Sequence, residues 1–364
     1  MIWQSAVSFV VILGLLVLVH ELGHFLVARL FKVGVDEFGF GFPPRLFGKT
    51  IGQTVYSINA IPIGGFVKIK GIIEEDGTNA HTPHADHFTA QPLWKRFSIL
   101  IAGIVMNYLL TIALLAVGYS VGMPSYLDQL PASARIMDRA ITVADITPDV
   151  PAAVAGLTTG DAITAVNGTT VTTLSEVKQQ LVVGLPGDSV TLTVQRNGET
   201  VGITATTIAL ADGVPGIGAY FVETGRVQLP VGQAILQASQ QTWQLTKGLA
   251  LAFVGLLRSA FQGEDVSAAV SGPVGIATLT YQATQLGFVY LIQFAALLSL
   301  NLAVFNLLPF PPLDGGKLIF VVLEAIVRRP VPMRWQIAVH NIGFIIFLIF
   351  IMAVTVKDVI GLVS

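Results

Sequence analysis

VLVHELGHFL, residues Val17–Leu26, carries a His-Glu-x-x-His motif inside an apolar run long enough to cross a lipid bilayer. On a helix, His20 and His24 lie one turn apart on the same face, so both imidazole rings can reach one metal ion. Glu21 stands beside them as a candidate general base. The stretch therefore predicts a metal site within a membrane-spanning helix.

The composition is that of an integral membrane protein. Of the 364 residues, 53% are hydrophobic and only 12% are charged, and the mean hydropathy is +0.73. A net charge of -2 gives no sign of the concentrated basic face that nucleic-acid binding requires. The chain has no cysteine, so disulfides and thiolate ligands are excluded and a metal ion would be held by His, Asp or Glu.

Four segments are long and apolar enough to span a bilayer, at about 4–30, 97–121, 287–309 and 336–356. The first lacks the positive n-region and cleavage site of a secretory signal, so we expect it to be retained. Positive charges gather in the loop between the first two spans and in the loop between the last two. They are Arg29, Lys32, Arg45, Lys49, Lys68, Lys70, Lys95 and Arg96, then Arg328, Arg329 and Arg334. The positive-inside rule therefore places both loops in the cytoplasm and both termini outside.

A fifth apolar segment, about 231–261, is interrupted by glutamines and by Lys247, and Arg258 closes it. If this segment crossed the bilayer, the cationic cluster between the last two spans would face outward, against the charge rule. We therefore predict an amphipathic helix lying on the outer surface.

The first cytoplasmic loop contains strand-like segments. Thr54–Ile61 and Phe66–Ile69 are separated by Pro62 and the pair Gly64-Gly65, which predicts a β-hairpin. Just before them, Phe38–Pro43 is apolar and glycine-rich, and either dips back into the membrane or forms a buried turn.

Other histidines are left out of the predicted site. His81, His84 and His87 lie in a loop-like stretch where Pro83 breaks helical spacing, so a second metal site is the less favoured interpretation. His340, with Asn341, begins the fourth span and is interpreted as a helix–helix or interfacial contact.

A water-soluble domain is inserted between the second and third spans. From about 141 to 207 the chain has short Val/Ile/Thr strands punctuated by Gly, Pro and Asp. Pro148–Gly168, the helix-like Leu174–Leu181 and the closing strands at 189–196 and 199–206 resemble the core of a PDZ domain. PDZ domains bind an extended peptide along a sheet edge. This one either binds peptide or protein termini or acts as a size filter or spacer.

The predicted fold class is a polytopic α-helical membrane protein with four transmembrane helices, a cytoplasmic membrane-associated β-hairpin and an inserted extracytoplasmic α+β PDZ domain. The predicted boundaries are 1–31 for the first transmembrane helix, 32–96 for the cytoplasmic loop, 97–121 for the second transmembrane helix, 122–225 for the extracytoplasmic region, 226–286 for the surface helical region, 287–316 for the third transmembrane helix with its LDGG motif, 317–335 for a cytoplasmic loop, 336–356 for the fourth transmembrane helix and 357–364 for the tail.

The second half of the site follows the third span, where residues Asn306–Lys317 read NLLPFPPLDGGK. The third span runs in the same direction as the first, so Asp314 emerges at the depth of His20 and His24. An ionisable residue at the end of a membrane helix needs a partner. Two histidines and one carboxylate form a three-ligand site with an open fourth position, the pattern of catalytic zinc.

These motifs together resemble the site-2 proteases, intramembrane zinc metalloproteases, and especially the bacterial PDZ-containing branch of the regulator of sigma-E protease type. The resemblance includes HELGH at 20–24, the glycine-aromatic loop at 39–42, IPIGGFVK at 61–68, one PDZ domain, SGPVGI at 271–276 and the Asn306–Gly316 stretch. The family usually shows Ala-Gly-Pro-x-x-Asn in its second span; residues 102–107, AGIVMN, lack the proline and keep Asn107. Some relatives carry two PDZ domains where this chain has room for one.

The resemblance implies a zinc ion held by His20, His24 and Asp314, with Glu21 taking a proton from water and returning it to the leaving amine. Asn306 and Asn107 would hydrogen-bond the extended substrate or its developing oxyanion. Interhelical bonding is the alternative for Asn306. The strand edge formed by Phe66, Val67, Lys68 and Ile69 would capture an unwound substrate.

The implied partners are the lipid bilayer and single-pass transmembrane proteins, such as an anti-sigma factor or a signal-peptide-like segment, cut after a first protease has trimmed them. This is regulated intramembrane proteolysis at a bacterial inner membrane, with the active site near the cytoplasmic face. The alternatives are a membrane-anchored zincin that cuts soluble or unfolded proteins, a non-enzymatic PDZ-bearing scaffold, and a descendant of the family that has lost catalysis.

Overall fold

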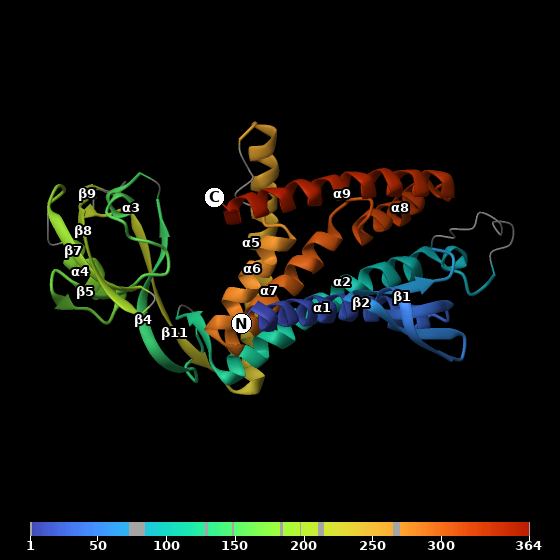
Figure 1. The fold of residues 1–364 in the computed structure, drawn as a ribbon, viewed down its shortest axis with the longest axis horizontal. Coiled ribbons are helices and arrows are strands. Elements are labelled where there is room, and N and C mark those ends of the chain that lie inside the picture. The colour runs from blue at the N-terminus through green and yellow to red at the C-terminus, as the bar shows by residue number, and fades with distance from the viewer. Residues whose placement is uncertain are drawn as a thin grey trace. The chain divides into compact units, whose positions relative to one another are not determined.

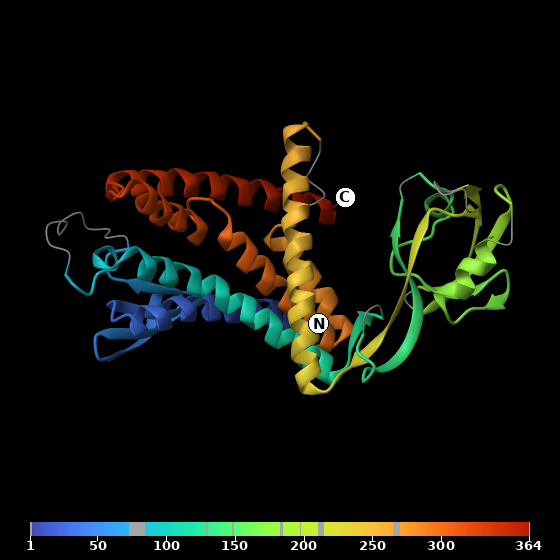
Figure 2. The same cartoon turned by 180° about the vertical axis from the view of Figure 1, so that it is seen from behind.

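The computed structural model describes residues 2–72, 84–127, 130–147, 149–182, 185–196, 198–209, 215–264 and 270–363. The chain divides into two compact units, one of Met1–Ala116 with Ile235–Ser364 and one of Val117–Ala234. The first unit is mainly helical and the second is built around a sheet (Figures 1 and 2). His81 and its neighbours at 73–83 lie outside the described residues.

Four helices of the described chain are long and apolar enough to cross a membrane. They are α1 (Ile2–Leu30), α2 (Leu93–Val121), α7 (Phe288–Leu307) and α9 (Met333–Val363), and Figure 1 shows each as one continuous ribbon. They contain the four spans that the sequence predicted. The apolar side chains on their outer faces would be unfavourable in water, whereas a bilayer solvates them.

Three further helices accompany the spans. α5 (Val231–Phe261) forms the predicted helix at 231–261 and is not among the four span candidates. α6 (Pro273–Leu286) follows it, and α8 (Asp314–Val327) occupies much of 317–335, where only a loop was predicted. A short 3-10 helix, η1 (Phe88–Ala90), precedes α2.

The amino end of α6 is tied to the carboxyl end of α9. The backbone N–H groups of Gly272 and Gly275 donate to Oδ2 of Asp358 at 2.9 and 2.7 Å. A carboxylate at a helix amino terminus satisfies backbone donors that have no partner within the helix. The SGPVGI motif is therefore a packing element that joins two helices.

The β-hairpin was predicted in the wrong place. Strands β1 (Val35–Ile51) and β2 (Thr54–Ile69) pair antiparallel, and they are joined at Gly52-Gln53. Pro62 and Gly64-Gly65 lie within β2, where the strand crosses from one side of β1 to the other: Ile58 and Gly65 both pair with Phe40. The segments on either side of these residues pair with β1 and not with each other, so they do not form the predicted hairpin. A Cβ at Gly65 would lie 2.9 Å from the Gly39 carbonyl oxygen, so glycine permits the close approach to β1.

Residues Phe38–Pro43 belong to β1, which corrects the expectation of a re-entrant loop or buried turn. Phe38 lies opposite Tyr56 in the register on one side and opposite Val67 on the other. The Phe38 ring also packs against Phe25 of α1, with the centroids 5.0 Å apart. This apolar, glycine-rich stretch is thus the inner part of a small sheet packed on α1.

The second unit contains a seven-stranded sheet in the order β3-β11-β4-β5-β7-β8, with β6 paired to β5. The strands are β3 (Met123–Tyr126), β4 (Arg135–Ile146), β5 (Ala162–Val166), β6 (Thr169–Thr170), β7 (Ser189–Arg196), β8 (Glu199–Thr206) and β11 (Ala219–Gln228), with β9 (Ile208–Ala209) and β10 (Pro215–Gly216) forming a separate pair. Two helices, α3 (Pro151–Val154) and α4 (Leu174–Val182), complete the unit.

The PDZ-like domain extends beyond the predicted limit of 207. β11 pairs along β4, and Ile217 and Phe221 lie in the same buried core as Ile141 and Val194. The segment near 219–228 was missed because its pairing partner lies about 80 residues earlier in the chain. A strand that completes a sheet from such a distance carries no local pattern that assigns it to the domain.

Candidate metal centre

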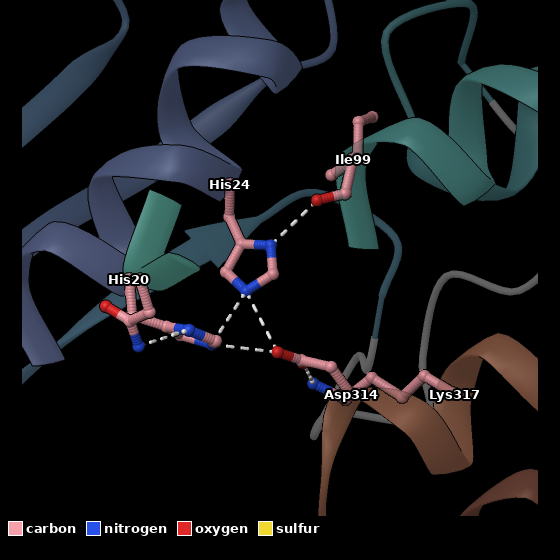
Figure 3. Close-up of polar contacts among 6 residues, drawn as sticks. His20, His24, Ile99, Asp314 and Lys317 are labelled. Carbon is pink, nitrogen blue, oxygen red and sulfur yellow. Dashed lines mark hydrogen bonds and ion pairs between the residues drawn. The ribbon is translucent and has the colours of Figure 1, made fainter. Parts of the chain in front are cut away.

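Three side chains converge at the centre of the helical unit. Nε2 of His20 lies 2.9 Å from Oδ2 of Asp314, Nε2 of His24 lies 3.1 Å from the same oxygen, and the two Nε2 atoms are 3.2 Å apart. Figure 3 shows His20 and His24 from α1 pointing toward Asp314 from α8. All three residues are buried, at 6%, 5% and 8% exposure. The structure thus brings together the three predicted ligands across about 290 residues of sequence.

The orientation of His24 is set by the backbone of α2. Its Nδ1–H donates to the carbonyl oxygen of Ile99 at 2.7 Å (Figure 3). A carbonyl oxygen can only accept, so the proton lies on Nδ1 and Nε2 keeps a free lone pair. That lone pair faces Asp314, as metal coordination requires.

Close packing of α1 against α2 places this carbonyl and shapes the site. A Cβ at Gly23 would clash with the carbonyl of Ala102, so glycine is needed where the helices meet. A Cβ at Gly103 would lie 2.5 Å from Nε2 of His24 and 2.8 Å from Cε1 of His20. The hydrogen atom of Gly103 therefore leaves room beside Nε2 of His24 and Cε1 of His20.

Asp314 is presented by the first residue position of α8. The chain turns sharply after α7 because Gly315 and Gly316 pack against the backbone carbonyls of Leu308 and Phe310, where no Cβ fits. Nζ of Lys317 lies 3.5 Å from Oδ1 of Asp314, the oxygen that does not face the histidines (Figure 3). The LDGG motif thus combines a ligand with the tight turn that aims it.

The donor set fits a zinc ion. A tetrahedral site with bonds of 2.0–2.1 Å places its donors about 3.4 Å apart, and the three donor atoms lie 2.9, 3.1 and 3.2 Å from one another. Two imidazole nitrogens and one carboxylate oxygen are ligands that zinc accepts with a fourth position open. The space that a Cβ at Gly103 would fill adjoins one of these donor atoms, Nε2 of His24.

The other predicted site residues are not among the three converging side chains. Glu21 is half-buried on α1 beside His20, and Asn306 is half-buried in the last turn of α7. Asn107 is fully buried, with its Nδ2 at 3.3 Å from Nδ1 of His20. The strand residues Phe66, Val67, Lys68 and Ile69 lie in the part of β2 that pairs with the start of β1.

Histidines outside the site remain apart from it among the residues that the structure describes. His84 and His87 lie near each other, with ring centroids 5.4 Å apart, and no second cluster of three metal-ligating groups is present in the described part of the chain. Nδ1 of His340 lies 3.2 Å from the carbonyl oxygen of Pro311, so it contacts the connection between α7 and α8.

Sequence reasoning missed Gly103, the Ile99 carbonyl and Lys317. Every residue has a backbone carbonyl oxygen, so the sequence does not mark the one at Ile99 as an acceptor. Gly103 did carry a sequence signal, since it lies four residues before Asn107 and so shares a helix face with a polar residue inside an apolar span. Lys317 lies three residues after Asp314 at the start of a helix, which places the two side chains together.

The chain is similar to known proteins over nearly its whole length. A family model described as peptidase family M50 matches residues 8–350. A protein of Mesorhizobium japonicum, named as a candidate zinc metalloprotease, is 35% identical over 381 residues, which cover 98% of this chain and 99% of that protein. Zinc metalloprotease RasP of Geobacillus kaustophilus is 27% identical over 430 residues, covering 98% of each. The PDZ domain of an SdrC-like protein from Listeria monocytogenes matches 24% of this chain and 92% of its own, with 24% identity and a TM-score of 0.22.

Proposed function

The chain belongs to peptidase family M50, the site-2 proteases, and on that premise we propose that it cuts the transmembrane segments of single-pass membrane proteins. It is a zinc metalloprotease with apolar helices that fit a membrane protein. The observation that carries the proposal is the convergence of His20, His24 and Asp314 on α1 and α8, with α1 itself a span candidate. A metal site within a spanning helix is suited to a peptide bond that lies in the membrane.

The proposed mechanism assigns a role to each residue of the centre. His20, His24 and Asp314 hold zinc, which when bound supplies a Lewis acid that polarises the scissile carbonyl and acidifies water. Glu21 accepts the proton of the attacking water and returns it to the leaving amine. Asn306, eight residues before Asp314, hydrogen-bonds the substrate backbone, with interhelical bonding as its alternative role.

A transmembrane substrate is helical and its amide groups are already paired, so it must unwind before it is cut. The residues Gly65–Ile69 of β2 pair with β1 on one side, and no strand in the described part of the chain pairs with their other side. An open strand edge can pair with an extended peptide. We propose that Phe66, Val67, Lys68 and Ile69 hold the unwound segment in this way.

Proline substitutions at Val67 and Lys68 test this edge. Adjacent residues of an antiparallel strand direct their N–H groups to opposite sides, so one proline removes a donor from the open side and the other removes a bond to β1. The proline that removes the donor from the open side should lower turnover about fivefold, since one hydrogen bond is worth about 1 kcal/mol, while zinc content and thermal stability are retained. The proline that removes a bond to β1 should lower stability instead.

Turnover of a single-pass substrate, zinc content and thermal unfolding are measured for both variants. The two prolines control for each other, because they are neighbours that differ in the direction of the missing N–H. If neither variant lost turnover while keeping its stability, the edge would have no role in substrate binding.

The PDZ-like unit is proposed to act on the extracytoplasmic part of the substrate. Its helix α4 contacts β11, and β3 pairs with β11 only from Thr224 to Val227. Among the described residues, no strand pairs with Ala219–Val222 on the side away from β4. That edge could hold a peptide terminus. A domain of this size could equally exclude targets with large ectodomains, so that a first protease must trim them.

Cleavage of a panel of single-pass proteins, each with its full ectodomain and in trimmed form, tests the proposed function. The purified chain in detergent should cut trimmed forms within the membrane segment, as mass spectrometry of the product termini would show. A chelator should abolish the products and added zinc should restore them. Cuts confined to soluble segments would favour a membrane-anchored zincin, and no cut in any target would favour a scaffold.

The location is part of the proposal. Membership of the family favours the inner membrane of a bacterium, and the charge distribution favours both termini outside and the metal centre near the cytoplasmic face. An anti-sigma factor or a signal-peptide-like segment would present its membrane helix to such a site.

A further inference from the structure

The second ring nitrogen of His20 faces α2. While Nε2 points to Asp314, Nδ1 lies 3.3 Å from the carboxamide of Asn107. His20 is 6% exposed and Asn107 is 0% exposed, so both side chains are shielded from solvent. Asn107 therefore contacts His20 through the ring nitrogen that does not face Asp314. This contact does not favour the sequence-based expectation that Asn107 binds the substrate.

The position of the proton on His20 decides what Asn107 must do. A neutral imidazole carries its proton on one nitrogen, so a ring that binds metal through Nε2 must carry it on Nδ1 and needs an acceptor there. The acceptor atom of Asn107, Oδ1, is buried and has no hydrogen-bond partner among the described residues. A half-turn of the carboxamide exchanges Oδ1 with Nδ2 and aims Oδ1 at Nδ1 of His20.

Asn107 is itself held in place from α7. Its backbone carbonyl oxygen accepts a hydrogen bond from Oγ of Ser299 at 2.9 Å and one from Oγ1 of Thr111 at 3.0 Å. Ser299 and Thr111 are both 0% exposed. A buried hydroxyl without a partner is costly, so these bonds fix where Asn107 lies between α1 and α7.

We propose that Asn107 is a positioning residue that accepts a hydrogen bond from Nδ1–H of His20 and thereby fixes the tautomer and ring orientation of this ligand. The Ile99 carbonyl accepts the corresponding hydrogen bond from His24, so each histidine has its own acceptor on α2. The inference rests on the proposed function, because it concerns the same metal centre. It assigns Asn107 to the support of a ligand and leaves substrate contacts to other residues.

Asn107→Leu and Asn107→Asp separate this role from general packing. Leucine matches the shape of asparagine but accepts no hydrogen bond, whereas aspartate keeps an acceptor facing Nδ1–H. Zinc affinity, measured by chelator competition on the purified full chain, should fall about 10–100-fold in Asn107→Leu. In Asn107→Asp it should equal or exceed that of wild type. The visible absorption of the cobalt-loaded protein should change in Asn107→Leu alone.

Thr280→Val is the matched control, because Thr280 is 0% exposed on α6 and its hydroxyl bonds only within that helix. Thermal unfolding without metal reports folding, and Asn107→Ala replaces the leucine variant if that one fails to fold. The inference is overturned if the variant without an acceptor binds zinc as tightly as wild type, or if Asn107→Asp binds as weakly as Asn107→Leu. A wild type that binds no zinc would overturn the proposed function as well.

Discussion

Gly103→Ala is expected to empty the metal centre. The added Cβ would lie 2.5 Å from Nε2 of His24 and 2.8 Å from Cε1 of His20, closer than non-bonded atoms approach. Both rings are held by other contacts, at Ile99 and at Asn107, so they cannot simply turn away. Zinc content should fall from about one ion per chain to near zero, and peptide cleavage should fall to background. Atomic absorption and product analysis measure the two quantities.

Gly248→Ala provides the control for this substitution. Gly248 is also within a long helix, α5, but a Cβ there meets no atom within 4 Å. This variant should retain zinc and activity, and its helix should be slightly favoured because alanine has the higher helix propensity. A Gly103→Ala protein with normal zinc content and normal turnover would show that the packing around His24 is looser than the structure indicates.

Glu21→Gln should lose cleavage and keep its metal. The substitution preserves size and burial but removes the carboxylate that accepts the proton of water, and general base catalysis contributes a factor of about 10²–10⁴. Turnover of a single-pass substrate should fall by that factor. Zinc content should stay at the wild-type value, because the proposed ligands are His20, His24 and Asp314.

Asp314→Ala is the matched comparison, since it removes a ligand and should lose zinc and turnover together. The pair separates the proton-transfer role from the metal-holding role, and the two are measured on the same preparations. Equal turnover in Glu21→Gln and wild type would rule out Glu21 as the base. Normal zinc content in Asp314→Ala would show that the third ligand lies elsewhere.

Local patterns were sufficient to predict the four long apolar helices and the proposed ligands. Runs of apolar residues long enough to span a bilayer have few alternatives in lipid, so four long apolar helices could be predicted from sequence, and the described chain contains them. The spacing of His20 and His24 depends only on helical periodicity. Asp314 required one more step, the direction of the third span, because a carboxylate near Gly-Gly is otherwise an ordinary turn residue.

The β structure and the PDZ boundary were harder. Gly64-Gly65 has the sequence of a turn, and β2 does cross there from one side of β1 to the other, but the segments on either side pair with β1 and not with each other. The turn at Gly52-Gln53 has a weaker signature. For the β structure and for the PDZ boundary, the contact that decides the outcome is made with a segment distant in sequence. Such contacts override intrinsic strand propensity.

The sequence by itself determined the class of the protein and its long apolar helices, and it predicted three ligands and a base, because bilayer length, helical period and ligand chemistry each act on a few neighbouring residues. The tertiary structure alone decided how His20, Glu21, Leu22, Gly23 and His24 become a site. Gly103 leaves space beside the imidazoles, the Ile99 carbonyl sets one tautomer, and Asn107 borders the other ring. These contacts join α1 to a helix about 80 residues away, and their effect depends on tenths of an ångström in helix packing, which no local pattern encodes.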